Sequence, residues 1–362
     1  MLRVVIDTGN APSKTGIGVY SNGLLRALRA YGHLTISLSE STFSSTSQSL
    51  RPLHRLIYLS RLRKAYKRNY DGAEVLHFTN VYVPPKHKEV AYLGTVHDID
   101  AILYPSTYSL RYRLYFKRMV DNSLRRADKI LTDSEAARES ILNYSSILPE
   151  RVKAIGIGLS PEFIENVKLC DDSSFDRGSN RTILFVGSLS GKKNIAWTIR
   201  SLAAAVRSGA LPRLKLVLAG GEGFGFNEIR SEINRTQQIV QWVKSPGLQS
   251  LVSLYKKADA VILPSRTEGF GIPLLEAMYC RKPIIASRIP SSVEVASSAA
   301  NYFDLDDEES LYDAVRRALE DSNSQERIVT AQQQLSKYSW EKLAPQYLSV
   351  YSEAITIHRS MV

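Results

Sequence analysis

The sequence has few cysteines and no long hydrophobic run. Its only cysteines are Cys170 and Cys280, which are too few for a disulfide framework and form no zinc-type pair. No apolar run approaches the roughly 20 residues that span a bilayer. The amino-terminal MLRVVIDTGN lacks the apolar core of a secretory signal. We therefore expect a cytoplasmic protein of a reducing compartment, soluble or at most lying on a membrane surface.

Acidic residues are also in deficit. The chain carries 47 lysines and arginines against 36 aspartates and glutamates, a formal net charge of +11, so its partners are expected to be anionic. Nucleic acid, phosphorylated metabolites and an anionic membrane face all fit this charge. The length of 362 residues suits two domains, since single domains usually have about 100 to 200 residues.

Short apolar runs alternate with helical segments along both halves of the chain. Runs such as LRVVID, AYLGTV, RTILFV, LKLVLA and ADAVIL are apolar throughout, which is typical of parallel strands covered on both faces. A polar stretch without periodicity at 166–180 is interpreted as a linker. The sequence therefore predicts an α/β protein with two Rossmann-like doubly wound domains, residues 1–165 and 181–340, facing a cleft. Ligands of such sheets bind beyond the carboxyl ends of the strands.

The stretch SRTEGFGIPLLEAMYC, residues 265–280, places Glu268 and Glu276 on either side of a glycine-rich turn. Gly269 and Gly271 allow the backbone to approach a ligand closely. Either glutamate alone is more simply read as a solvated loop residue or as a partner of the helix dipole. The spacing of the whole string after a buried strand instead favours a binding site.

The helix after this turn is expected to begin at Pro273, which suits the first helical position. Free amides near Leu274 and Leu275, together with the helix dipole, then predict an anion site between the two glutamates. A ligand with phosphate in its middle and hydroxyl-rich groups at both ends would contact the anion site and both glutamates. That is the shape of a nucleotide-sugar.

The string EGFGIPLLEAM resembles the Glu-x7-Glu motif of retaining glycosyltransferases of the GT-B fold, in the family 4 group that includes bacterial mannosyltransferases. Further stretches resemble this family in the expected order: GIGVY at 16–20, VHD at 96–98, ILTDSEAA at 130–137, FVGSLSGKKN at 185–194 and YSWEKLA at 338–344. The resemblance implies the GT-B fold, with a carboxyl-terminal helix at 341–362 that crosses back to the first domain. That first domain would bind the acceptor and the second the nucleotide-sugar.

The resemblance assigns roles to the glutamate pair. It implies that Glu276 holds the ribose hydroxyls of the donor and that Glu268 contacts the donor sugar. The backbone of Phe270, Gly271 and Ile272 is expected beside that sugar.

The resemblance also places the phosphate-binding lysine at Lys193, where a positive charge would stabilise the departing diphosphate. Many members have arginine directly after the glycine of this stretch, whereas this chain has Ser188. Lys192 and Arg266 are the candidates for a second cation, and the sequence reading favours Arg266.

Gly16 and Gly18 follow the first strand and are expected to let the backbone approach the diphosphate from the first domain, although a structural turn explains them equally well.

His97 ends the strand in TVHDID and has two interpretations. With Asp98 and Asp100 it could mark an Asp-x-Asp metal site, as in GT-A enzymes. The resemblance instead implies that His97 reaches the donor sugar, and we favour this, with no metal or other cofactor required.

The basic segments at 51–68 and 108–129 lie in the first half of the chain. In the second of them, Tyr112 and Val120 are expected on an apolar face and Arg118 and Lys129 on a basic one. Family acceptors are often lipid-linked sugars, so peripheral contact with anionic lipid on the cytoplasmic face of the inner membrane is expected.

We therefore predict a retaining transferase that moves a sugar to a glycan or lipid-linked oligosaccharide of polysaccharide or O-antigen synthesis. GDP-mannose is the favoured donor and UDP-sugars come next. A GT-B epimerase or phosphorylase and a nucleic-acid-binding protein are the alternatives, although no nucleic-acid-reading motif is present.

Overall fold

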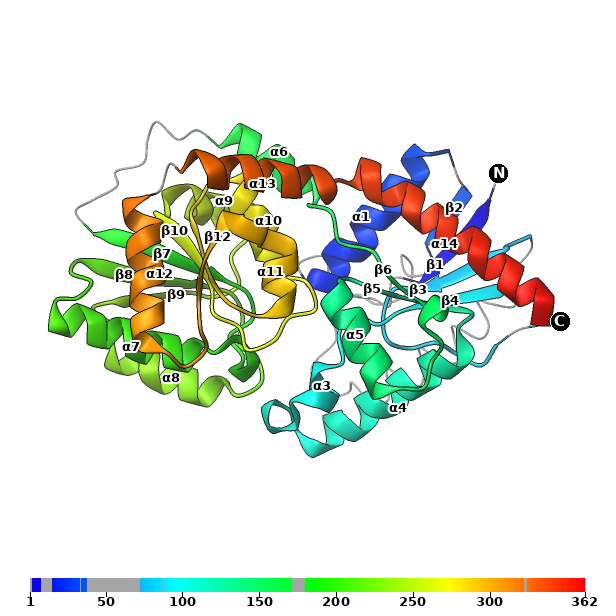
Figure 1. Cartoon of the computed structure of the whole chain (residues 1–362), viewed down its shortest axis with the longest axis horizontal. Coiled ribbons are helices and arrows are strands. Elements are labelled where there is room, and N and C mark those ends of the chain that lie inside the picture. Colours follow the sequence, from blue (N-terminus) through cyan, green and yellow to red (C-terminus); the bar gives the residue numbers. More distant parts are fainter. Residues whose placement is uncertain are drawn as a thin grey trace.

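The computed structural model describes residues 2–7, 15–32, 34–37, 72–86, 88–170, 180–321 and 324–361. The two predicted doubly wound α/β domains are confirmed, and they lie side by side (Figure 1). The basic segment at 51–68 lies outside the described residues.

The first domain has a six-stranded parallel sheet in the order β2-β1-β3-β4-β5-β6. Its strands are β1 (Arg3–Asp7), β2 (Leu34–Ser37), β3 (Val75–Phe78), β4 (Ala91–Thr95), β5 (Lys129–Thr132) and β6 (Val152–Ala154). Its helices are α1 (Gly16–Ala30), α3 (Asp100–Leu103), α4 (Leu110–Arg126) and α5 (Glu135–Tyr144), with 3-10 turns η2 (Pro105–Thr107) and η3 (Pro149–Arg151). Strands β3, β4 and β5 are buried at every position, as expected for a sheet covered on both faces.

The second domain has a parallel sheet in the order β12-β11-β10-β7-β8-β9. Its strands are β7 (Arg181–Val186), β8 (Leu214–Ala219), β9 (Val240–Val243), β10 (Ala260–Leu263), β11 (Ile284–Ser287) and β12 (Ala300–Phe303). Its helices are α7 (Ile195–Ser208), α8 (Phe226–Arg235), α9 (Leu248–Lys257), α10 (Ile272–Tyr279), α11 (Pro290–Ala296) and α12 (Glu308–Glu320), with 3-10 turns η4 (Gly191–Lys193) and η5 (Ser297–Ala299). Strand order reverses between β7 and β10, so a crevice is expected beyond their carboxyl ends.

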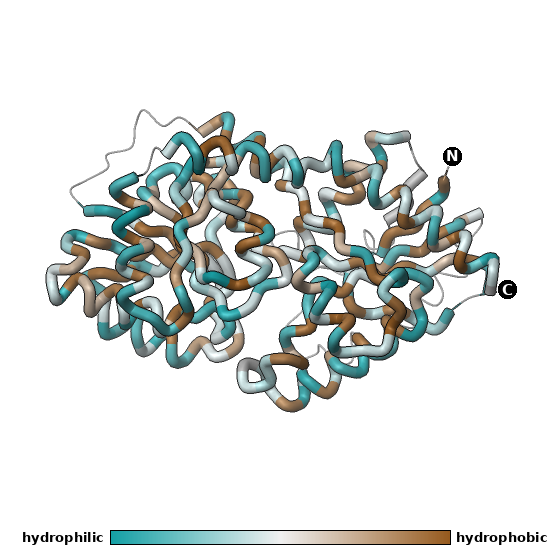
Figure 2. The backbone as a smooth tube through the Cα atoms, in the orientation of Figure 1, coloured by the Kyte–Doolittle hydropathy of each residue, from teal (hydrophilic) through white to brown (hydrophobic). Residues whose placement is uncertain are grey.

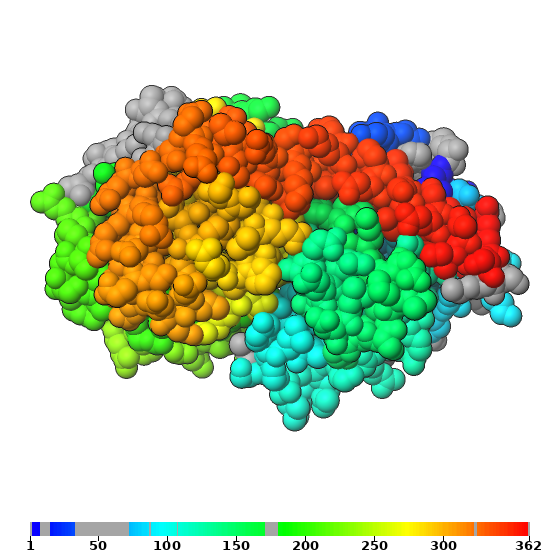
Figure 3. Space-filling view, in the orientation of Figure 1, coloured from blue at the N-terminus to red at the C-terminus, as the bar shows by residue number. Residues whose placement is uncertain are grey.

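Two crossings join the domains. Helix α6 (Pro161–Leu169) precedes the second sheet in the chain and packs on α9. Helix α13 (Gln325–Lys337) leads into α14 (Trp340–Met361), which runs over the first domain and packs on α1, β3 and β4 (Figures 1 and 3). The predicted linker therefore began too early, because residues 166–169 complete α6.

Trp340 fixes the second crossing. Its indole packs between α1 and the segment before α6, where a Cβ added to Gly158 would lie 2.6 Å from the ring nitrogen. The same nitrogen donates a hydrogen bond of 3.0 Å to the Leu159 carbonyl. The apolar core is continuous from the first domain through this region into the second, and the hydrophobic strands lie inside both lobes (Figure 2).

Helix α4 is shorter than the predicted segment 108–129. It ends at Arg126, and the following chain turns into β5, so Lys129 is a buried strand residue and not part of a basic helical face. Val120 is buried as predicted, whereas Tyr112 is 44% exposed. Among the helices in the described ranges, none is both long and apolar enough to cross a membrane.

Candidate active site

The loops that follow β7 and β10 meet at the reversal point of the second sheet. These strands are neighbours, so the residues just after them share one edge. The Arg266 amide donates a hydrogen bond of 2.9 Å to the Lys192 carbonyl, which ties the two loops together. Lys193 and Glu268 are thereby brought into contact although they lie 75 residues apart.

Lys193 and Glu268 form an ion pair that is largely shielded from solvent, with side chains 13% and 8% exposed. The Ser265 hydroxyl donates a second hydrogen bond, of 2.6 Å, to the same carboxylate oxygen of Glu268. Burial alone would raise the pKa of Glu268, but Lys193 and Lys192 hold it below its ordinary value. Glu268 is therefore an anion with one oxygen already saturated.

Glu276 lies on α10 and is partly buried. Its Oε2 accepts a hydrogen bond of 2.6 Å from the hydroxyl of Tyr255 on α9. Burial raises the pKa of Glu276 to about 7, although the Tyr255 hydrogen bond opposes this shift. Tyr255 is itself fixed by the ring of Phe163 on α6, at 5.6 Å between centroids.

The start of α10 differs from the prediction in two details. Gly271 is the N-cap with φ of +98°, which favours glycine, and the helix begins at Ile272, so Pro273 occupies the second position. The amide of Leu274 is not free, because it donates a hydrogen bond of 2.9 Å to the Gly271 carbonyl. A tight first turn of this kind is a common way to satisfy helix-terminal groups. An anion here would depend on the other amides of the turn.

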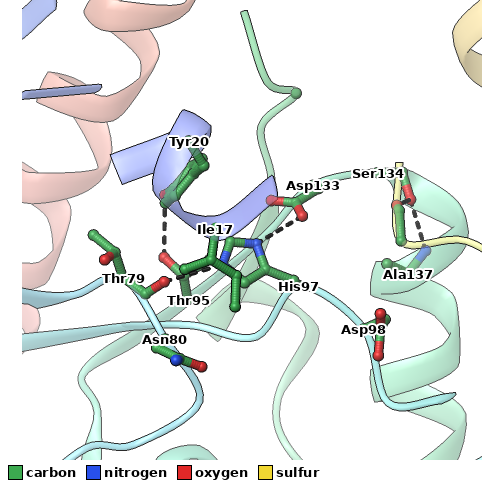
Figure 4. A network of polar contacts seen from close by, with 12 residues as sticks. Ile17, Tyr20, Thr79, Asn80, Thr95, His97, Asp98, Asp133, Ser134 and Ala137 are labelled. Carbon is green, nitrogen blue, oxygen red and sulfur yellow. Dashed lines mark hydrogen bonds and ion pairs between the residues drawn. The ribbon is translucent and has the colours of Figure 1, made fainter. Parts of the chain in front are cut away.

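His97 follows β4, which lies between β3 and β5, and both neighbouring strands supply it with a partner (Figure 4). Its Nδ1 lies 2.8 Å from Oδ2 of Asp133, after β5, and its Nε2 lies 3.0 Å from the carbonyl oxygen of Thr79, after β3. The ring of Tyr20 on α1 packs edge-on against the imidazole, with centroids 5.0 Å apart.

This geometry makes His97 a cation. A carbonyl oxygen and a carboxylate both accept hydrogen bonds, so both ring nitrogens must donate, which only the protonated ring can do. Burial lowers the pKa of His97, but Asp133 and the Thr79 carbonyl outweigh it and the pKa lies above its ordinary value. A donor sugar would therefore have to replace one of these partners to receive a hydrogen bond from the ring.

The two domains touch where His97 meets the glycine-rich turn. A Cβ added to Gly269 would lie 2.5 Å from the His97 carbonyl oxygen, so only glycine fits. The Ser134 hydroxyl donates a hydrogen bond of 2.6 Å to the Gly269 carbonyl. His97 and the Glu268 loop are thus brought together across the cleft.

A second contact lies nearby, at the start of α5. The carboxylate of Glu294, on α11, accepts hydrogen bonds from the amides of Glu135 and Ala136, at 2.9 and 3.2 Å. Amides in the first turn of a helix have no partner within the helix, and negative charge is favourable there. The side chain of one domain therefore caps a helix of the other.

Asp98 and Asp100 lie opposite Lys192. The Lys192 Nζ is 2.8 Å from Oδ2 of Asp100 and 3.3 Å from Oδ2 of Asp98, and Thr267 donates a hydrogen bond of 2.8 Å to the other Asp100 oxygen. Beside them lies a cavity of about 90 Å³, which Glu268 also lines. In the described part of the chain, no three histidine, cysteine, aspartate or glutamate side chains are grouped to hold a metal ion.

The two candidates for the second cation occupy different places. Arg266, which the sequence reading favoured, forms two hydrogen bonds of 2.7 and 2.5 Å with Asp306 on the surface. Lys192 instead lies in the cleft, 18% exposed. Ser188, where the family arginine is expected, is exposed to solvent.

Gly16 and Gly18 lie in the first turn of α1, and only Gly16 faces the other domain as predicted. Gly16 begins α1 and faces Ile272 of the other domain, at 3.8 Å from an added Cβ, so these two predicted site residues do meet. The amide of Gly18 donates a hydrogen bond of 3.2 Å to the Thr15 side chain, which caps the helix. This amide is therefore not free for a diphosphate. Phe270 points into the core and packs edge-on against Tyr338.

Sequence reasoning missed several partners of the predicted residues, among them Thr79, Asp133, Ser134 and Tyr255. The first three follow β3 or β5, the strands on either side of β4. Their position at strand ends was the available signal, because such ends converge at one edge of a parallel sheet. Tyr255 lies in the last turn of α9, away from any strand end, and carried no such signal.

The arrangement of two doubly wound domains with converging strand ends defines the structural class. Sucrose-phosphate synthase from Thermosynechococcus elongatus superposes with a TM-score of 0.75 at 18% identity, covering 98% of this chain and 100% of that chain. Anabaena HepE in complex with UDP-glucose gives a TM-score of 0.70 at 16% identity, with coverage of 98% and 100%. The protein has the GT-B fold.

Sequence comparison identifies the enzyme class within that fold. Residues 171–335 match the family model described as Glycosyl transferases group 1. O-antigen chain mannosyltransferase B of Escherichia coli is 26% identical over 285 residues, 76% of this chain and 74% of the relative. O-antigen chain mannosyltransferase RfbU of Salmonella typhimurium is 26% identical over 79% and 76% of the two chains. A GDP-mannose:cellobiosyl-diphosphopolyprenol alpha-mannosyltransferase of Xanthomonas oryzae is 28% identical over 68% and 64%. Residues 171–335 therefore form a group 1 glycosyltransferase domain, and the chain is similar to mannosyltransferases over most of its length, in agreement with the motif resemblance.

Proposed function

We propose that the protein transfers a mannosyl group from GDP-mannose to a hydroxyl of a glycan or lipid-linked oligosaccharide, with retention of anomeric configuration and without a metal ion. The observation that carries this proposal is the Lys193–Glu268 ion pair, which lies across the cleft from His97, with Glu276 on the adjoining helix. The names of the Escherichia coli, Salmonella and Xanthomonas relatives support the choice of mannose.

The donor would lie along the carboxyl edge of the second sheet. Glu276 would accept hydrogen bonds from the ribose hydroxyls, and Lys193 with the start of α10 would bind the diphosphate. Glu268 has one oxygen saturated by Lys193 and Ser265, and its other oxygen would accept from the sugar hydroxyls. Phe270, Gly271 and Ile272 would supply backbone groups beside the sugar.

In the transfer step, the bond between the anomeric carbon and the diphosphate oxygen breaks, and the acceptor oxygen bonds to that carbon on the same face. The proton of the acceptor hydroxyl passes to the departing phosphate oxygen. Negative charge grows on the diphosphate as it leaves, so a fixed ammonium such as Lys193 stabilises the transition state more than the ground state. His97, held as a cation at the opposite wall, adds positive potential to the cleft.

Metal independence is proposed because protein cations are available for the diphosphate. Asp98 and Asp100, the residues suited to a divalent ion, are already paired with Lys192. Full turnover in excess chelator is the expected result, and its loss on chelation with recovery on adding Mg²⁺ or Mn²⁺ would refute this part.

The acceptor would approach the first domain, and α4 suits a membrane-bound one. Leu110 and Leu114 are each 63% exposed on this helix, beside the exposed Arg111 and Arg118. Exposed apolar side chains among arginines are typical of helices that lie on anionic lipid. Co-sedimentation with vesicles containing phosphatidylglycerol, lost on adding salt, is expected, and equal absence at all salt concentrations would refute the contact.

The donor proposal is tested by a thermal-shift panel. Because donor binds only the folded protein, GDP-mannose should raise the unfolding temperature, while UDP-glucose and UDP-N-acetylglucosamine should not. Glu276→Ala should abolish the shift without changing the melting temperature of the free protein by more than a few degrees. Stabilisation by a UDP-sugar alone would overturn the choice of donor. Release of GDP only when acceptor is present would separate a transferase from an epimerase.

A further inference from the structure

Lys192 forms ion pairs with two carboxylates in the cleft. Its ammonium lies between the carboxylates of Asp98 and Asp100, which belong to the other domain. The Asp100 side chain is only 5% exposed, and Thr267, from the same domain as Lys192, holds its second oxygen. The two ion pairs of Lys192 and the Thr267–Asp100 hydrogen bond therefore all bridge the two domains.

This cluster adjoins the proposed diphosphate site. Lys192 and Lys193 are consecutive in η4, and the Lys192 carbonyl accepts the Arg266 amide beside Glu268. The charge of Lys192 helps to hold the pKa of Glu268 low, which places it within electrostatic reach of that carboxylate. Since Ser188 offers no charge and Arg266 pairs with Asp306, Lys192 is the best placed of these three residues to assist Lys193.

We propose that Lys192 is the second cation of the diphosphate site and that Asp98 and Asp100 are counter-ions that an arriving diphosphate displaces. The proposal rests on the proposed function, because it takes a nucleoside diphosphate as the ligand. One ammonium and two carboxylates together carry net negative charge, which opposes an anionic ligand. Donor affinity is thereby lower than the two lysines alone would give, and the same ion pairs join the domains until the donor enters.

The ionisation of the cluster agrees with this role. Burial and the neighbouring Asp98 raise the pKa of Asp100 to about 6, against the opposing effect of Lys192. The Tyr108 phenol and the Thr267 hydroxyl also lie near Asp100. The charge of His97 lowers the pKa of Asp98, and the charge of Glu268 raises the pKa of Lys192. The carboxylate of Asp100 is thus the counter-ion that is neutralised most easily.

Isothermal titration with GDP, UDP and inorganic pyrophosphate tests the proposal on the full chain. Asp100→Asn keeps the acceptor for Thr267 but removes the charge. It should therefore bind pyrophosphate about tenfold more tightly than wild type does. The same gain is expected for whichever of GDP and UDP the wild type binds more tightly. Asp98→Asn should act in the same direction. Lys192→Met should bind about tenfold more weakly.

Glu294→Gln is the matched control. It weakens a contact between the domains without touching the charge at Lys192, so it should change pyrophosphate affinity less than twofold. The inference would be overturned if Asp100→Asn and Asp98→Asn bound pyrophosphate more weakly than wild type. It would also be overturned if Glu294→Gln gained as much affinity as they do, because the ion pairs would then only hold the domains together. Wild-type affinity in Lys192→Met would overturn it as well. If wild type binds no nucleoside diphosphate, the proposed function itself fails, whereas tight wild-type binding with unresponsive variants removes only the inference.

Discussion

The hydroxyl of Tyr255 donates a hydrogen bond of 2.6 Å to Glu276, so the glutamate proposed to hold the donor ribose is supported from behind by another helix of its own domain. Tyr255 has no place in the motif around Glu276, and it reaches this glutamate from α9. The hydrogen bond uses one carboxylate oxygen of Glu276, in an environment buried enough to raise the pKa of Glu276 to about 7.

Donor affinity should therefore depend on pH near neutrality. Ribose hydroxyls donate to a carboxylate better than to a carboxylic acid, so the Kd of GDP-mannose should fall between about pH 6 and pH 8. Each phosphate of a nucleotide-sugar has a single acidic oxygen, which is already ionised throughout this range. In titration calorimetry, the control Glu276→Gln should bind more weakly and should not gain affinity between pH 6 and pH 8. A wild-type affinity that is flat with pH would contradict the role.

The stability of the free protein should move in the opposite direction. Because the folded-state pKa of Glu276 is raised above its unfolded value, this group stabilises the fold below about pH 4.5 and the contribution is lost as pH rises through about 7. Denaturant unfolding of wild type and Glu276→Gln across this range should converge at the acidic end. Divergence there and convergence at high pH would show the reverse linkage.

The Lys193–Glu268 pair separates catalysis from stability. Lys193→Met removes the charge that stabilises the leaving diphosphate, so kcat should fall by about 100-fold with a smaller change in KM. It also leaves Glu268 buried without its partner, which lowers the unfolding temperature. The double variant Lys193→Met with Glu268→Gln should regain much of that stability and none of the turnover. Recovery of turnover in the double variant would mean that the pair is only structural.

Gly269→Ala should disturb the contact between the domains. A methyl group there would lie 2.5 Å from the His97 carbonyl oxygen, so the loop must shift and the free energy of unfolding should fall by about 1–3 kcal/mol. Gly247→Ala is the matched control, since Gly247 has an ordinary φ of −68° and open space for a Cβ. Equal melting temperatures for the two variants would show that the domains do not meet there in solution.

Asp133→Asn should change the charge of His97. With a neutral amide at Nδ1, the raised pKa of His97 should fall toward or below its ordinary value, and ring nitrogen shifts in NMR should report this. The raised pKa stabilises the fold below the ordinary value near 6.5, and this contribution is lost as pH rises through the folded-state pKa. The variant should lose that part of the pH dependence. An unchanged His97 titration would contradict the dyad.

The sequence was sufficient for the features that depend on local pattern. Apolar runs predicted the strands, and Glu268, Lys193 and His97 were expected near one cleft because each follows a strand. Parallel strands force such positions to one edge, so no long-range information was needed.

The residues that escaped prediction are those whose role depends on contacts between distant segments. Asp133 matters only because β5 pairs with β4, and Glu294 only because α11 faces α5. The Leu274 amide was expected to be free because a sequence gives helix position but not the tightness of the first turn. Arg266 was preferred over Lys192 because Asp306, forty residues away, gave no sign of capturing it.

The two crossings have a consequence for how the molecule can be divided. Helix α6 precedes the second sheet in the chain and packs on the second lobe. Helix α14, at the end of the described chain, packs on the first lobe. The first lobe is therefore built from two separate stretches of polypeptide, whereas the second is contiguous once α6 is counted with it. A fragment cut between the sheets would lack an outer layer that only its counterpart carries, so isolated halves should be insoluble singly yet reconstitute on mixing.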